Sequence, residues 1–443
     1  MLQTRNGVLH IGQTSICDLA DKYPDPFYVY DGDAIEQQMC RIKSLLARGV
    51  EVIYSLKANP NLSIAALLST CADGVDVSSL REMQVALGAG FSPAQIFFVG
   101  PGKSLQEIES AVQANIGCLV VESRDELQQT DRIASRLGKR ANVALRLNPA
   151  LEASGGRLKM GGAPTQFGID EEQAGEVIVW SRSLRNVRII GLHVYMGTRI
   201  LDWAVAARNT EEILKLTARF QESYGLELEL VDVGGGLGVP YFRGEQPFDL
   251  ERFAKEVNPA FARFQQSFPG VRLVMELGRF VVAEAGIYVA KVRYVKTSRG
   301  KTYVLVSGGM NHHQGTTSVG SVLKDHFPIR VLNKMDHAAA SPVVVCGPLC
   351  TPADILGRAV GLPPVEAGDL IGIMNSGAYG LTASPVEFLS HRWPGEILVY
   401  GGEDHLVRRS PTLSESLQFQ PLVRVKSQVH GHTHEAVPTL VEG

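Results

Sequence analysis

The chain has few cysteines, almost no net charge and no long apolar run, and each shortage excludes a class of protein. Its 443 residues include 6 cysteines and have a formal net charge of −3. The scattered cysteines form neither a disulfide framework nor a CxxC zinc pair, so a cytoplasmic, reducing location is expected. The balanced charge argues against a nucleic-acid partner or a polybasic membrane contact. We expect neither a membrane span nor a signal peptide.

A repeating strand–helix pattern runs through residues 51–278. With 45% hydrophobic residues, the chain can build two domains with substantial cores. The strand-like runs are continuously apolar, as in parallel strands covered on both faces. Eight such strands, each followed by a helix, predict an α/β fold with a closed (β/α)8 TIM-like barrel. An open doubly wound sheet is the alternative, but no GxGxxG turn supports it. The expected strands are residues 51–57, 75–79, 96–100, 118–122, 142–148, 187–197, 228–234 and 271–278.

The pattern changes after residue 286, where short β-prone segments alternate with Gly, Pro and Asn. This pattern predicts an antiparallel β-sandwich or β-barrel domain. We expect the barrel at residues 27–286, the β domain from residues 1–26 and 287–425, and a flexible tail at 426–443. The three tail histidines are not expected to form a metal site, because a flexible tail holds no geometry.

One lysine stands at the end of an apolar, β-prone run, in the segment YSLKANP at residues 54–60. Asn59 and Pro60 stop the strand, and a helical stretch follows. A lysine in such a place is costly to keep charged and unpaired. Burial lowers the pKa of an amine, and the neutral amine can then form a Schiff base. Lys57 is therefore a candidate catalytic residue, although a lysine that extends to solvent has the same local pattern.

Polar residues also fall at the ends of five other expected strands. The carboxyl ends of barrel strands meet at one rim, where the active sites of such barrels lie. Six polar strand ends on one rim therefore indicate a site. The residues are Asp76 and Ser79; Arg146 and Asn148; His193 and Tyr195; Gly234, Gly235 and Gly236; and Glu276, Gly278 and Arg279.

Two of these strand ends have the chemistry of a cofactor site. The turn DVGGGLGVPY can present backbone N–H groups to a phosphate beside Arg279, although a loop that only needs positive φ has the same composition. Glu276 can bond a ring nitrogen, and its alternative is a core salt bridge with Arg279 or Arg146. A lysine, a phosphate cradle and an acid are the three contacts that pyridoxal 5'-phosphate requires.

The chain resembles the fold-type III pyridoxal-phosphate-dependent decarboxylases, the family of the diaminopimelate and ornithine decarboxylases. The resemblance runs from about residue 26 to residue 424 and has the family's motifs in the family's order. The motifs are YSLKANP, VDVSSLREM, LRLNP, GLHVYMGT, DVGGGLGVPY, ELGRF, GPLCTPAD and NSGAYG.

The resemblance implies a reaction and a role for each site residue. Lys57 would be the Schiff-base lysine, Glu276 would face the pyridine nitrogen, and Tyr379 would touch the cofactor. The glycines at 234–236, with Arg279, would hold the phosphate. The reaction would be α-decarboxylation of an amino acid, with a carbanion that the ring absorbs as a quinonoid. Cys350, supplied by the partner subunit of a homodimer with shared active sites, or Lys57 itself would then protonate Cα.

Four positions depart from the family's usual motifs. Tyr195 stands where a histidine usually stacks on the pyridine ring, and His193 lies two residues earlier. Leu277 replaces a proline, and Arg81 replaces a glycine. Thr351 follows the cysteine where the family usually has an acid that binds the distal ammonium of the substrate. A free diamine precursor is therefore a less favoured substrate.

The segments KMGGAPTQFG, GPLCTPAD and GAYGLTASPVEFLSH resemble one branch of the family. Members of this branch act on conjugated amino acids, either carried on an acyl-carrier protein in antibiotic biosynthesis or linked to citrate in siderophore biosynthesis. The candidate substrate contacts are Arg157, Lys159, Thr351 and Asp354. The first two could meet an anionic conjugate or a carrier phosphopantetheine, and a solvated loop is their ordinary alternative.

Three other functions are weighed against this one. A decarboxylase of free diaminopimelate or another basic amino acid shares all the motifs except the acid at Thr351. An alanine-racemase-like isomerase would need a second acid/base in place of Cys350. A non-catalytic vitamin B6 carrier or regulator would have lost Lys57 or Cys350, and this chain keeps both. No metal is expected in any of these.

Overall fold

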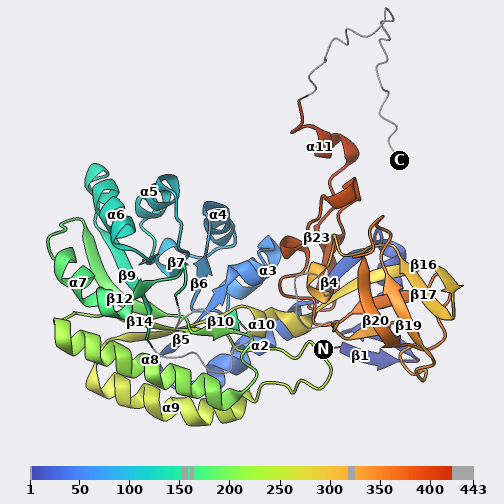
Figure 1. Ribbon diagram of the computed structural model, residues 1–443, viewed down its shortest axis with the longest axis horizontal. Helices are drawn as coiled ribbons and strands as arrows, with labels where there is room; N and C mark the ends of the chain where they lie inside the picture. The colour runs from blue at the N-terminus through green and yellow to red at the C-terminus, as the bar shows by residue number, and fades with distance from the viewer. Residues whose placement is uncertain (1, 151–157, 160–163, 318–324, 422–443) are drawn as a thin grey trace, which may run out of the picture.

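The computed structural model describes residues 2–150, 158–159, 164–317 and 325–421. Figure 1 shows a barrel and a β-rich domain side by side, with the helix α11 (Leu413–Leu417) projecting beside the β-rich domain. The expected tail at 426–443 and the candidate Arg157 lie outside the described residues. No helix in the described part of the chain is long and apolar enough to cross a membrane.

The first domain is a closed parallel barrel of eight strands, as the apolar runs predict. Each strand pairs in parallel with the next, β15 pairs with β5, and β8 with β9, so the ring is complete. Continuous apolar strands fit this place because helices cover the outside and the barrel interior is packed. The strands are β5 (Val50–Ser55), β6 (Gly74–Val77), β7 (Ile96–Phe98), β8 (Cys118–Val121), β9 (Ala141–Asn148), β12 (Val187–Val194), β14 (Leu230–Gly235) and β15 (Arg272–Leu277).

A helix follows each barrel strand, and the longer of these helices lie on the outside of the ring (Figure 1). Short polar caps begin many of these helices; Ser104, for example, forms a capping box with Glu107. The helices are α3 (Leu62–Ser69), α4 (Leu80–Gly88), α5 (Leu105–Ala114), α6 (Arg124–Arg136), α7 (Glu171–Ser181), α8 (Trp203–Tyr224), α9 (Leu250–Ser267) and α10 (Arg279–Val282), with α2 (Gly32–Leu45) ahead of β5.

Two short pairings add to the rim of the barrel. β11 (Ile169–Asp170) extends the sheet beside β9, and β10 (Leu158–Lys159) pairs with β13 (Gly197–Thr198). These pairings bring the chain after β9 back to the rim, where the strand ends meet.

The β-rich domain is a mixed sheet rather than the purely antiparallel one that we expected. β17 pairs in parallel with β19, and β22 with β4, whereas the other pairs are antiparallel. Neither parallel pair is joined by a hairpin, so parallel pairing is possible. The strands are β4 (Phe27–Asp31), β16 (Gly286–Ser298), β17 (Lys301–Val306), β18 (Ile329–Val331), β19 (Pro342–Cys346), β20 (Ile355–Gly361), β21 (Leu370–Ile373), β22 (Gly395–Tyr400) and β23 (Glu403–Arg408).

The strand β4 corrects the domain boundary that we placed at residue 27. It lies between β16 and β22 in the β-rich sheet and pairs with no barrel strand. Its five residues are all buried. An apolar run immediately before a barrel resembles a further barrel strand in sequence, and only the pairing distinguishes the two.

The N-terminal residues pack on the β-rich domain. The strands β1 (Leu2–Arg5), β2 (Val8–Ile11) and β3 (Thr14–Ser15) form a small sheet, followed by α1 (Ile16–Lys22). Apolar side chains of β2 and α1 share a core with β4 and β16, and the N–H of Leu9 donates to the carbonyl of Leu332 at 2.8 Å.

Candidate active site

Lys57 lies in a single helical turn directly after β5, at the carboxyl end of the barrel. Its Nζ is 3.1 Å from each carboxylate oxygen of Asp76, which lies near the end of β6 and is fully buried. Ser55 donates to the same carboxylate at 2.7 Å. The Lys57 side chain keeps 34% of its surface exposed, toward a cavity at the rim. Two neighbouring strand ends thus bring the predicted amine and an acid together.

The pKa of Lys57 is raised, whereas we expected burial to lower it. Burial alone does lower the pKa of this amine, but the nearby carboxylates Asp76 and Glu276 outweigh it and favour the ammonium. Burial raises the pKa of Asp76 to about 7, against the opposing effect of Lys57. The prediction of a neutral lysine from burial alone is therefore wrong, because the acids that reverse it come from other strands.

Three buried polar side chains form a cluster at the barrel centre. His193 Nε2 lies 3.3 Å from Glu276 Oε1, and Asp232 of β14 completes a group whose ligand atoms lie within 4.8 Å of one another. Burial raises the pKa of Glu276, but His193, Lys57 and Arg146 outweigh it and lower the pKa to about 2. Burial and Glu276 raise the pKa of Asp232 well above its usual value.

Several polar atoms of this cluster are free to form further hydrogen bonds. Both ring nitrogens of His193, Oε1 of Glu276 and Oδ2 of Asp232 lack a hydrogen bond within the part of the chain that the structure describes. Buried polar atoms are nearly always satisfied, so atoms like these indicate a place for a further group. Sequence reasoning missed Asp232, although an acid inside the apolar run LELVDV was a usable signal.

A cation and an aromatic ring lie beside the lysine, and a second ring lies beside the cation. Arg279 begins α10, and its guanidinium lies 4.4 Å from the ring centroid of Tyr379. Its Nη1 donates to the hydroxyl of Tyr241 at 3.1 Å, whereas its Nε has no partner among the described residues. Tyr379 comes from the β-rich domain, so this domain supplies part of the site. Tyr241 was not predicted from the sequence, although it ends the motif DVGGGLGVPY.

The glycines at 234–236 are required by close backbone packing. A Cβ at Gly235 would lie 1.9 Å from the carbonyl oxygen of Glu276, and one at Gly236 would lie 1.9 Å from that of Gly197. The φ angles of Gly234 and Gly236 are 67° and 81°, which L side chains rarely adopt. Gly278 is similarly tight, because a Cβ there would lie 2.8 Å from Ser55 Cβ. This packing accounts for the glycines, and their binding of a phosphate stays a prediction.

The cavity at the rim has a volume of about 490 Å³. It brings together seven of the predicted cofactor residues, and burial raises the pKa of one of them, Tyr195, to about 12. The side chains of both Tyr195 and His193 line it, so either ring is available for stacking. The predicted residues that line it are Lys57, Arg146, His193, Tyr195, Glu276, Arg279 and Tyr379.

A buried acid, Glu122, connects three segments of this rim. Its Oε1 accepts from Arg146 at 2.8 Å and from the N–H of Gly100 at 3.0 Å, and its Oε2 accepts from the N–H of Gly168 at 3.0 Å. The guanidinium of Arg146 lies 4.7 Å from the ring centroid of Phe167. Arg146 thus reaches the cavity while paired. Sequence analysis did not single out Glu122, although an acid at the end of the expected strand 118–122 was a usable signal.

Cys350 lies outside this cavity. It is exposed, in the loop between β19 and β20, and it does not line the cavity around Lys57 in the described chain. Thr351 is half-buried, with its hydroxyl accepting from the N–H of Ala353 at 3.3 Å. Within one chain the structure therefore does not bring Cys350 and Lys57 together.

Asp354 does not present a free carboxylate to a substrate, contrary to our expectation. Only 3% of its surface is exposed, and its two oxygens accept from the N–H groups of Met310 and Leu349 at 2.7 and 2.8 Å. Because both oxygens bond backbone, Asp354 fixes the loop that carries Cys350.

The other two substrate candidates lie in the segment after β9. Arg157 is outside the described residues. The backbone of Lys159 is described, and it pairs with Gly197 two residues beyond Tyr195. This pairing brings the segment to the rim of the cavity.

Comparisons with known proteins agree with this geometry. The profile of the family described as "Pyridoxal-dependent decarboxylase, pyridoxal binding domain" matches residues 32–283. The L-glutamyl-(BtrI acyl-carrier protein) decarboxylase of Niallia circulans is 38% identical over 416 residues, covering 93% of this chain and 97% of that protein. A diaminopimelate decarboxylase of Helicobacter pylori is 33% identical, covering 88% of this chain and 93% of that protein.

Solved structures show the same architecture. Diaminopimelate decarboxylase from Helicobacter pylori, complexed with L-lysine, superposes with a TM-score of 0.82 at 31% identity, covering 91% of this chain and 98% of that one. The enzyme from M. jannaschii gives a TM-score of 0.87 at 26% identity, covering 95% and 98%. The match favours a decarboxylase over the isomerase and the non-catalytic carrier. This chain belongs to the pyridoxal-dependent decarboxylases, and pyridoxal phosphate is its cofactor.

Proposed function

We propose that this enzyme removes the α-carboxylate of an amino acid whose far end is conjugated, as in a carrier-bound substrate. The observation that carries the proposal is Thr351, which offers a hydroxyl where a free diamine substrate would need an acid. Asp354, the nearest acid along this loop, is buried and bonded to backbone. The 38% identity to a decarboxylase of carrier-bound glutamate supports the same substrate class.

The residues around Lys57 fit pyridoxal phosphate. Lys57 would bind its aldehyde, and the unbonded Oε1 of Glu276 can accept a hydrogen bond from a pyridinium nitrogen. The unbonded Nε of Arg279, beside the glycine turn, can donate to a phosphate. When bound, the cofactor supplies an electron sink for the charge left at Cα when CO2 departs. The low pKa of Glu276 keeps this residue anionic, as a partner for a protonated ring nitrogen must be.

Proton transfer falls to Lys57 and Cys350. Asp76 and Glu276 favour the protonated amine of Lys57, so a released Lys57 can donate a proton at Cα. Cys350 is a second donor. Because this thiol is exposed and does not line the cavity of its own chain, we propose that it completes the site of the partner in a homodimer.

The position of Lys159 supports a conjugated substrate as well. Its backbone lies at the cavity rim, beside Gly197, where the segment can meet the far end of a ligand. Arg157, two residues earlier, is proposed for the same contact from the sequence alone.

The test is CO2 release by the purified holoenzyme from three sets of substrates: free amino acids, citrate-linked amino acids and amino acids loaded on an acyl-carrier protein. We expect turnover of a conjugated set with little release from free diamine precursors. Robust turnover of free diaminopimelate would refute the inference drawn from Thr351. It would support the second candidate function, decarboxylation of free diaminopimelate, which the similarity to the Helicobacter pylori enzyme favours.

A further inference from the structure

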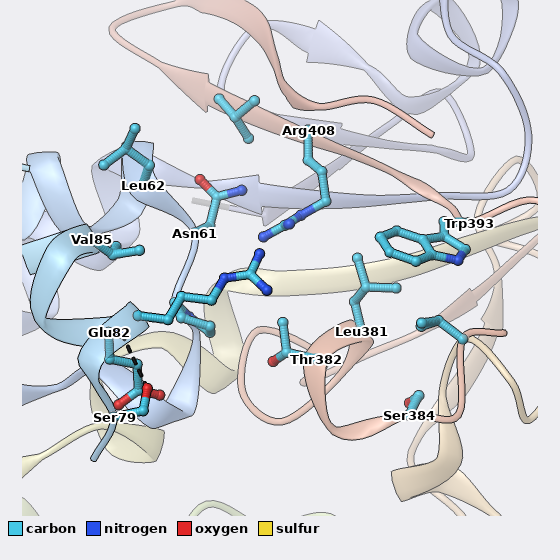
Figure 2. A pocket seen from close by; sticks show the side chains of 14 residues that line it. Asn61, Leu62, Ser79, Glu82, Val85, Leu381, Thr382, Ser384, Trp393 and Arg408 are labelled. Atoms are coloured by element: carbon cyan, nitrogen blue, oxygen red, sulfur yellow. Dashed lines mark hydrogen bonds between the residues drawn. The ribbon is translucent and has the colours of Figure 1, made fainter. Parts of the chain in front are cut away.

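A second cavity lies between the barrel and the β-rich domain. It has a volume of about 500 Å³. Figure 2 shows Leu62 and Val85, from α3 and α4, on one side of it and Leu381 and Trp393, from the β-rich domain, on the other. Leu62 is 52% exposed, so the cavity opens to the surface. Ser79, one of the predicted rim residues, lines it, but the residues to which a cofactor or substrate contact was assigned do not.

One of the arginines that line this cavity has no partner among the described residues. Arg81 of α4 makes no ion pair or hydrogen bond with any residue that the structure describes, and its side chain is exposed. Glu82 beside it is engaged, because its carboxylate accepts from the N–H of Ser78 at 2.7 Å. Figure 2 shows Glu82 next to Ser79, at the edge of the cavity. Arg81 is therefore the group available to an incoming anion.

The second arginine of the lining is already neutralised. Arg408 pairs with Glu396, which is 1% exposed and also accepts from Asn61 at 2.9 Å and from Tyr30 at 2.6 Å. This bonded group forms a fixed polar wall, with Asn61 and Arg408 close together in Figure 2. The cavity thus combines a polar wall, a free guanidinium and aliphatic and indole surfaces.

This cavity and the one that contains Lys57 have adjoining walls. Three segments pass directly from one to the other: Lys57 lines the first and Pro60 the second, Ser78 the first and Ser79 the second, and Tyr379 the first and Leu381 the second. A ligand in the second cavity would therefore lie next to the site of reaction.

These features match one kind of ligand. A phosphopantetheine arm carries a phosphate, which a guanidinium binds well, followed by an aliphatic and amide stem suited to apolar walls with hydroxyls and amides. The hydroxyls of Thr382 and Ser384 lie on the same wall as Leu381. We propose that the cavity lined by Arg81 binds the phosphate-bearing arm of a carrier-bound substrate. This inference rests on the proposed function and identifies Arg81 as the residue that recognises the conjugate.

Binding to the holoenzyme tests the site without turnover. Phosphopantetheine and pantetheine, which lacks the phosphate, are titrated by calorimetry, and tryptophan emission is followed in parallel. We expect phosphopantetheine to bind roughly three- to tenfold more tightly than pantetheine, the range for a charge-assisted contact at a partly exposed site. Arg81→Ala should abolish that preference, and Trp393→Phe should remove the emission change. Arg132→Ala, an exposed helix arginine elsewhere, is the matched control and should behave as wild type.

The outcomes separate this inference from the proposed substrate class. Equal affinity for phosphopantetheine and pantetheine, or an unchanged preference in Arg81→Ala, would overturn the inference. An emission change on binding that persists in Trp393→Phe would overturn it too. Binding only of a citrate-linked amino acid would also overturn it, in favour of a small acid. Phosphate-dependent binding at Arg81, without CO2 release from any carrier-bound or citrate-linked amino acid, would support the site and refute the proposed substrate class.

Discussion

The backbone N–H of Tyr379 donates to the carbonyl oxygen of Ala58 at 2.8 Å, one residue after the lysine of the site. Asn59 adds a second bond, from its side-chain amide to the carbonyl of Gly377 at 3.0 Å. Both bonds join the β-rich domain to the turn that holds Lys57. The second domain therefore positions the lysine of the barrel, in addition to supplying the ring of Tyr379.

Replacing Lys57 tests the cofactor attachment. Lys57→Ala removes the amine that would bind the aldehyde, so the purified protein should lose the visible Schiff-base absorbance and its decarboxylase activity. Spectra of the purified variant provide the measurement. Lys255→Ala, which removes an exposed lysine of α9, is the control and should keep both. Absorbance that survives in Lys57→Ala would refute the assignment.

Asp76 should slow cofactor loading at neutral pH. Only the neutral amine attacks an aldehyde, and Asp76 helps to hold the pKa of Lys57 above its usual value. Asp76→Asn should lower that pKa, so Lys57 should react faster near pH 7 and its rate profile should move to lower pH. The measurement is the rise in visible absorbance after pyridoxal phosphate is added to apoenzyme across pH. Ser55→Ala, which removes one hydrogen bond but no charge, should shift the profile less.

Mixing two inactive variants tests the shared site. Cys350→Ala should keep the absorbance and lose most turnover, because the thiol is proposed as a proton donor. When Cys350→Ala and Lys57→Ala subunits are unfolded and refolded together, half of the dimers should be mixed, with one intact site each. About a quarter of wild-type activity should return. No recovery, with mixed dimers verified by mass spectrometry, would place Cys350 and Lys57 in the same subunit's site or exclude the thiol.

The pair formed by Glu122 and Arg146 should be strongly coupled. Glu122→Gln leaves a buried guanidinium without its anion and should lower the free energy of unfolding by about 3 kcal/mol. Arg146→Gln should cost a similar amount, and the double variant should cost clearly less than the sum. Urea unfolding followed by circular dichroism gives the three values. Additive losses would mean that the pair does not interact energetically.

Two buried histidines should destabilise the fold in mild acid. Burial lowers the pKa values of His312 and His313 to about 4. In the neutral form, Nδ1 of His313 accepts from the N–H of Thr316 at 3.2 Å, and Nε2 can donate to Ser376 at 2.8 Å. Between pH 4 and about 6.5 the unfolded chain binds more protons than the folded one, so stability should fall as pH falls through that window.

The expected slope is up to about 1.4 kcal/mol per pH unit for each histidine. Melting temperatures across pH provide the measurement. His313→Gln should lose part of this slope, whereas His405→Gln, at a side chain that is 52% exposed, should retain all of it. A slope that is unchanged in His313→Gln would contradict the buried neutral form.

The sequence by itself determined the barrel and the position of its lysine. A continuous apolar strand is a local pattern, so β5 and the lysine that follows it could be predicted from a few consecutive residues. The rim position of Glu276 and Arg279 follows from the same reasoning, because parallel strand ends must meet at one edge.

Only the tertiary structure decided what surrounds those residues. The raised pKa of Lys57 arises from Asp76 and Glu276, which β6 and β15 bring to it from 19 and 219 positions away in the chain. Contacts between residues distant in sequence also decide the hydrogen bonds of Glu122, the burial of Asp354 and the sheet to which β4 belongs. Charge, burial and strand pairing depend on neighbours in space, and no local pattern specifies those neighbours.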